Sequence, residues 1–157
     1  MSERYEDVIL EEARRAMDFQ VAALDELRAR TGILLAAAAV SGSFLGAATA
    51  RASIGFGFLA GAAVVAFVLG VAFCIVVLWP PGEDAWIFVN SPKQLIEDWV
   101  NVEQDGQSML LFLAECLEDN YDKNERRLLD LYRWFQAAAI SVGAAVILGC
   151  IQLAASH

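Results

Sequence analysis

Histidine, cysteine and clustered carboxylates are the side chains of this sequence that could serve as bases, nucleophiles or metal ligands. The single histidine, His157, is the last residue, where no surrounding groups hold an imidazole as a general base. Cys74 and Cys150 lie in apolar runs and Cys116 lies on an apolar helix face, so we expect three small buried side chains without disulfides. There is no Ser/His/Asp or Cys/His set and no glycine-rich phosphate loop. The sequence therefore predicts a protein that is not an enzyme and has no metal or cofactor.

Acidic residues dominate the segment from 83 to 130, which holds twelve acids and four bases. These carboxylates could bind a divalent cation, but no EF-hand loop is present, so a solvated acidic face is the simpler interpretation. Lys123, Arg126 and Arg127 could contact a phosphate-bearing ligand. Bases just before an apolar run are more simply topology signals. The net charge of −9 disfavours a general affinity for nucleic acid, because the protein and the nucleic acid are both negatively charged.

Three long uncharged runs, at residues 32–50, 54–79 and 134–155, set the architecture. Each is long enough for a helix to cross roughly 30 Å of hydrocarbon. Hydrophobic residues make up 58% of the chain, more than a soluble domain of this length normally carries. The sequence therefore predicts an all-α integral membrane protein with three transmembrane helices. A soluble bundle that buries all three helices is the alternative, and extraction by salt alone would support it.

Lysine and arginine predict the orientation, because cytoplasmic flanks retain positive charge. Arginines precede the first uncharged run, and lysines and arginines follow the second. The short turn between these two runs has Arg51 as its one basic residue. This places the N-terminus in the cytoplasm and the C-terminus outside, and the acidic first thirty residues are unlike a cleaved signal. The predicted headgroup contacts and interfacial aromatics are Arg28, Arg30, Trp79, Arg126, Arg127, Arg133 and Trp134.

The flanking segments are predicted to be helical as well and to form a cytoplasmic bundle under the membrane, within a single structural unit. Residues 3–31 run into the first span and carry a stripe of apolar or neutral residues with a spacing near 3.5. The stripe is formed by Tyr5, Ile9, Ala13, Ala16, Gln20, Leu24 and Leu27. Residues 83–132 include the capping sequence Ser91-Pro92-Lys93-Gln94. The stretch from Asn120 to Asn124 fits either a turn or a continuous helix.

Glycines four residues apart occur in the first two spans, at Gly42 and Gly46 and at Gly57 and Gly61. Small residues at this spacing let two helix backbones approach closely. They pack either the first two helices of one chain, which we favour, or the helices of neighbouring subunits. Three helices cannot enclose an aqueous path, so conduction would require a homo-oligomer. No ionisable residue lies in mid-membrane, which argues against a proton-coupled transporter.

Two segments carry a resemblance to known families: the helix-to-membrane entry Leu24-Asp25-Glu26-Leu27-Arg28-Ala29-Arg30-Thr31-Gly32-Ile33-Leu34-Leu35 and the approach Asn120-Tyr121-Asp122-Lys123-Asn124-Glu125. With a tight membrane hairpin between them, they resemble the SLATT and Pycsar transmembrane effectors of bacterial phage defence. The chain is also similar to actinobacterial integral membrane or plasmid-transfer proteins.

The resemblance implies a homo-oligomeric effector of the bacterial plasma membrane. Its cytoplasmic bundle or a partner would hold it inactive. On a cytoplasmic, nucleotide-linked signal it would perturb or permeabilise the bilayer. No ligand-binding residue follows from it, and no separate sensor domain is evident in the sequence. The alternative function is a non-catalytic membrane adaptor that recruits a cytoplasmic protein, docked on residues 83–130, to a defence or conjugation complex.

Overall fold

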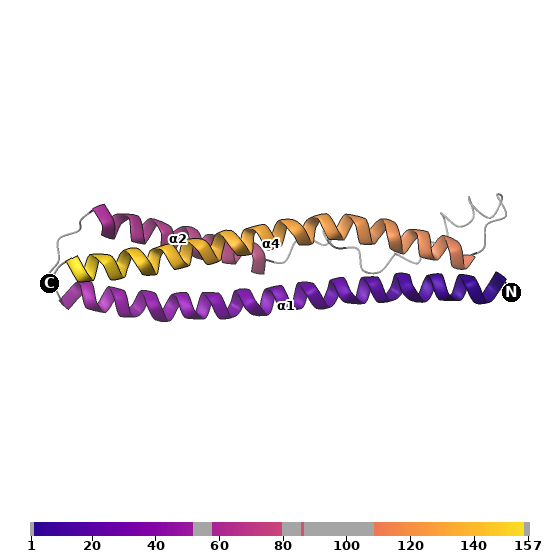
Figure 1. The fold of residues 1–157 in the computed structure, drawn as a ribbon, viewed down its shortest axis with the longest axis horizontal. Helices are drawn as coiled ribbons and strands as arrows, with labels where there is room; N and C mark the ends of the chain where they lie inside the picture. Colours follow the sequence, from indigo (N-terminus) through magenta and orange to yellow (C-terminus); the bar gives the residue numbers. More distant parts are fainter. Residues whose placement is uncertain (1, 52–57, 80–85, 87–108, 156–157) are drawn as a thin grey trace. The chain divides into compact units, whose positions relative to one another are not determined.

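The computed structural model describes residues 2–51, 58–79, 86 and 109–155, with side chains given from residue 6 and not for 48–51 (Figure 1). Three α-helices account for nearly all of this: α1 (Ser2–Arg51), α2 (Phe58–Leu78) and α4 (Met109–Ala155). All three are long and apolar enough to cross a membrane. The prediction of an all-helical chain with three potential membrane spans is therefore confirmed. The capping sequence at 91–94 and Gly57 lie outside the described residues.

The helix α1 is continuous over 50 residues and does not break at Gly32. Residues 2–51 contain no proline, and the three isolated glycines of this helix, Gly32, Gly42 and Gly46, are tolerated within it. Five of its buried residues are seven positions apart, the period of long packed helices: Leu10, Met17, Leu24, Thr31 and Ala38. Gln20 and Leu27, also seven apart, are buried between them. The predicted stripe missed Leu10 and Met17, because a helix buries a wider face than one row of side chains.

The helix α4 runs without interruption through residues 120 to 124, so the open question of a turn there is answered by a continuous helix. Asn120 and Asn124 are both buried in it. Each of the two residues makes a hydrogen bond or another specific interaction, as buried polar residues normally do.

The contacts divide the chain into two units, and α1 and α4 contribute to both. We call residues 1–25 with 81–129 the charged unit, and residues 26–80 with 130–157 the apolar unit. Each long helix gives its first part to the charged unit and its second part to the apolar unit. In the charged unit, the Gln20 side-chain Nε2 donates a hydrogen bond of 2.9 Å to the Tyr121 carbonyl oxygen, which joins α1 to α4.

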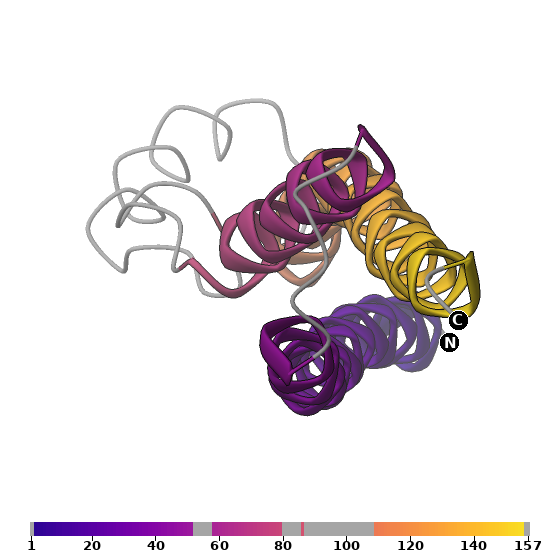
Figure 2. The same cartoon turned by 90° about the vertical axis from the view of Figure 1, so that its left-hand side faces the viewer.

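The apolar unit is a set of three helices in which every pair is in contact. Within it α1 and α4 run in the same direction and α2 runs against both (Figure 1), and the view along the helices shows them beside one another (Figure 2). Small side chains fill much of its core, including Thr31, Ala38, Cys74, Ala138 and Ala145. Such residues permit the close backbone approach that holds helices together where the surroundings are as apolar as the side chains.

Candidate functional site

One end of the apolar unit carries nearly all of its charge. Residues 31–50, 58–79 and 134–155 contain no Asp, Glu, Lys or Arg. Leu45 of α1 lies against Gly149 of α4, and the two helices run in the same direction. Counting back fifteen residues along each helix therefore places residue 30 of α1 level with residue 134 of α4.

The end of α2 lies at the same level. The rings of Phe73 and Trp134 are 5.4 Å apart between centroids. Trp79 directly follows the end of α2, and its backbone N–H donates to the Ile75 carbonyl oxygen. We call this region the basic end; it contains Arg28, Arg30, Trp79, Arg133 and Trp134. These are five of the seven predicted headgroup residues. Two indoles that are 68% (Trp79) and 43% (Trp134) exposed beside arginines make the pattern of a membrane–water interface.

Arg30 and Arg133 of the basic end are exposed and paired within their own helices. Arg30 bonds to Glu26, and Arg133 Nη1 lies 2.9 Å from Asp130 Oδ1. Such exposed pairs one turn apart contribute about 0.5 kcal/mol or less to stability. These two pairs therefore contribute little to the stability of the fold.

Arg28 differs from both. Its side chain is half-buried, and its Nε is enclosed without a hydrogen-bond partner. None of the five ion pairs among the described residues includes it. Arg28 is thus a half-buried positively charged side chain that forms no ion pair with a carboxylate among the described residues.

The three predicted phosphate-contact residues belong to the charged unit. Lys123, Arg126 and Arg127 share one exposed face of α4, since they are three and four residues apart. Lys123 is engaged by Asp119, one turn earlier. The structure places them on an open helix surface, where no described cavity gathers them.

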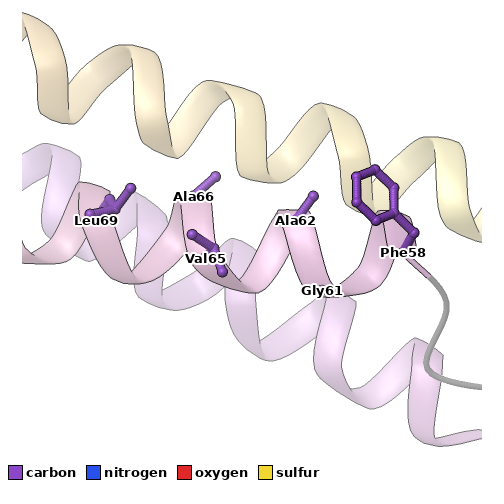
Figure 3. Close-up of a pocket in the computed structure, with 6 residues that line it drawn as sticks. All are labelled: Phe58, Gly61, Ala62, Val65, Ala66 and Leu69. Carbon is purple, nitrogen blue, oxygen red and sulfur yellow. The ribbon is translucent and has the colours of Figure 1, made fainter.

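The predicted glycine positions differ in what they face. A Cβ built on Gly42 would lie 3.1 Å from the Phe67 ring of α2, so Gly42 lies at the contact between the first two spans. A Cβ on Gly46 or Gly61 would meet nothing within 4 Å. Gly61 instead lines a shallow open groove along α2, whose walls are entirely apolar (Figure 3): Phe58, Gly61, Ala62, Val65, Ala66 and Leu69.

Two glycines that the sequence interpretation left out make the closest helix contacts. A Cβ on Gly70 would lie 2.7 Å from Val142 Cγ2 and 3.1 Å from the Val142 backbone nitrogen. A Cβ on Gly149 would lie 2.8 Å from Leu45 Cδ1. A signal existed for Gly70, because Ala66, Gly70 and Cys74 form a row of small residues spaced by four.

No protein-family model, no curated protein and no solved structure matches this chain. Within the described residues, no group of three or more His, Cys, Asp or Glu side chains could hold a metal ion. The three cysteines are free: Cys74 is buried and Cys116 is half-buried. The expectation of a buried Cys150 is wrong, because this side chain lies on a face of α4 that no described helix covers.

The surface of the apolar unit fits lipid better than water. Its exposed side chains include many large apolar ones along all three helices: Ile33, Val40, Phe44, Val64, Val65, Val68, Ile75, Val76, Ile140, Ile147 and Ile151. Contiguous apolar surface of this kind is rare on a soluble monomer. The three helices are therefore compatible with a multi-pass membrane protein.

Proposed function

We propose that the chain is a homo-oligomeric effector of the bacterial inner membrane, which perturbs or permeabilises the bilayer when a cytoplasmic signal reaches the charged unit. One observation carries this proposal: α1 and α4 each run unbroken from the charged unit into the apolar unit. A continuous helix transmits a rotation or shift along its length. A rearrangement of the charged unit would therefore move two of the three membrane helices.

The packing of the charged unit suits a switch. Gln20, Asn120 and Asn124 are buried polar residues where apolar ones would pack more stably. The Gln20 Oε1 is enclosed without a hydrogen-bond partner. An unsatisfied buried acceptor costs roughly 1–3 kcal/mol. A second arrangement that solvates or pairs this oxygen would thus lie close in free energy to the present one.

Assembly of several copies is needed for permeabilisation, because three helices cannot surround water. The open side of Gly61 and the apolar groove beside it leave room for a helix of a second copy. Close helix contact at small residues replaces hydrophobic attraction within the bilayer. The resemblance to phage-defence effectors supports a role in which the cell disables its own membrane on infection.

The test mimics the signal by breaking the charged unit from within. Met17→Asp puts a carboxylate at a position that is 5% exposed, whereas Phe19→Asp puts the same group on the same helix at a position that is 75% exposed. We expect induced Met17→Asp to collapse the membrane potential, as read by a potential-sensitive dye, and to stop growth. Wild type and Phe19→Asp should leave both unchanged at equal amounts of protein in the membrane fraction. If Met17→Asp inserts at that amount and the potential holds, the effector function is wrong.

A membrane adaptor is the second candidate, favoured by large apolar side chains exposed on the charged unit. Phe19 and Val8 are both exposed among acidic residues of α1. An exposed aromatic side chain is a frequent anchor for a partner protein. If the chain is an adaptor, a partner should co-purify with wild type and be lost from Phe19→Asp, and neither variant should depolarise the cell.

A further inference from the structure

Arg28 is held in an unusual way for a base at the end of a membrane unit. It stands in α1 between Leu27, which is 1% exposed, and Thr31, which is fully buried. The Thr31 hydroxyl donates to the Leu27 carbonyl oxygen at 2.7 Å, so this turn is tightly packed. The Nε of Arg28 is enclosed without a hydrogen-bond partner, while the residue as a whole stays half-buried. With Nε enclosed, the Nη1 and Nη2 groups are the part of the guanidinium left to bind a ligand.

A guanidinium edge of this kind has a defined chemical preference. Two parallel N–H groups match two oxygens of a phosphate or carboxylate, and Arg binds phosphate in this bidentate way. The two carboxylates of the apolar unit are already paired, Glu26 with Arg30 and Asp130 with Arg133. A half-buried side chain also loses less conformational freedom when a ligand binds than a fully exposed one does.

We propose that Arg28 binds the phosphate group of an anionic membrane lipid at the basic end of the apolar unit. The level of the residue favours a lipid over a soluble anion: the uncharged stretch of α1 begins at residue 31, and the exposed Trp79 and Trp134 lie at the same end. The chain carries a net charge of −9, so it repels anionic surfaces in general and a fixed local site is required for this contact. The site goes beyond the proposed function, because it depends on neither a signal nor assembly.

The experiment compares Arg28→Gln with Arg30→Gln, which removes the same charge two residues away from an exposed, paired side chain. The full chain is purified in detergent and given dioleoylphosphatidylglycerol or dioleoylphosphatidylcholine, and bound lipid is counted by native mass spectrometry. We expect wild type and Arg30→Gln to retain phosphatidylglycerol. Arg28→Gln should bind it about tenfold more weakly, the effect of losing one charge-assisted pair. Phosphatidylcholine should be retained less in all three proteins.

Two further arms identify the ligand and guard against misfolding. Inorganic phosphate is added in competition: if it displaces the lipid from wild type at millimolar concentration, the source is a free anion and the lipid proposal is overturned. Arg28→Lys keeps the charge without the paired N–H groups, so it should fold and still bind several-fold more weakly. Equal losses in Arg28→Gln and Arg30→Gln would mean that charge alone matters, which also overturns the site. None of these outcomes depends on membrane potential, so failure here leaves the effector test intact.

Discussion

Gly70 of α2 lies so close to Val142 of α4 that a methyl group on the glycine would come within 2.7 Å of Val142 Cγ2 and 3.4 Å of the Ala138 carbonyl oxygen. Two of the atoms it would meet belong to backbone, which cannot turn aside as a side chain can. This contact fixes how near α2 and α4 approach. It also makes the helix packing of the apolar unit testable by single methyl groups.

Gly70→Ala should lower the free energy of unfolding by about 1–3 kcal/mol, the usual cost of overpacking. Gly149→Ala should cost less than about 1 kcal/mol, because it meets the far end of the flexible Leu45 side chain. Gly61→Ala is the control, since nothing lies within 4 Å of its Cβ, and it should be neutral or slightly stabilising. Unfolding of the purified protein in mixed micelles, followed by circular dichroism, measures all three. Equal losses at Gly70 and Gly61 would contradict the described contact.

The open glycines test assembly separately from folding. We expect Gly46→Leu and Gly61→Leu to keep the helical content, because the added side chains start in open space. If these faces join subunits, both variants should reduce the mass of the detergent-solubilised particle towards that of one 17.1 kDa chain, measured by light scattering with bound detergent subtracted. Gly42→Leu is the contrast, because it would push on Phe67 within the chain. A monomeric wild type would exclude constitutive assembly and favour either a trigger-dependent oligomer or the adaptor.

The helices could be predicted from the sequence, but their mutual contacts could not. Uncharged runs of about 20 residues appear in the order of residues alone, so α2 and the second parts of α1 and α4 were expected. Whether a glycine faces a neighbour depends on how each helix is rotated about its axis. Gly42 and Gly46 look equivalent in sequence, yet a Cβ on the first alone would touch α2. The same rotation exposes Cys150 beside the tightly packed Gly149.

The candidate site shows the same division. The level of Arg28, Arg30 and Arg133 relative to the apolar runs could be predicted, because charges end such runs. That Arg28 alone is half-buried, with an enclosed Nε, could not be predicted, since all three are the same residue type in similar surroundings. The continuity of α4 through Asn120 and Asn124 could not be predicted either, because asparagine is compatible with both a turn and a helix.

Gln20 gives a prediction for the charged unit. Gln20→Leu removes a buried oxygen without a partner, which costs roughly 1–3 kcal/mol, and also the hydrogen bond from Nε2 to the Tyr121 carbonyl oxygen, which contributes about 1 kcal/mol. The free energy of unfolding should therefore rise by about 1 kcal/mol. Gln20→Ala removes the same oxygen but leaves a cavity, and should lower it by about 2 kcal/mol. Under the effector function, Gln20→Leu should also need more signal for activation, because it stabilises the quiet arrangement. If Gln20→Leu is as destabilising as Gln20→Ala, the Oε1 has a partner in solution and the switch argument loses its basis.

Orientation is tested with single cysteines in a chain whose Cys74, Cys116 and Cys150 are replaced by Ala. Asp7→Cys, Glu118→Cys and Ala155→Cys are all at exposed positions of α1 and α4. The positive-inside rule, applied to the arginines of the basic end, predicts that the first parts of both helices lie in the cytoplasm. A membrane-impermeant maleimide should therefore label Ala155→Cys in intact spheroplasts, and should label the other two only after permeabilisation. The opposite pattern would invert the topology, and would move Arg28 to the outer leaflet while leaving its chemistry unchanged. Labelling of all three in intact spheroplasts would contradict a membrane-spanning chain, since α1 and α4 would then cross nothing.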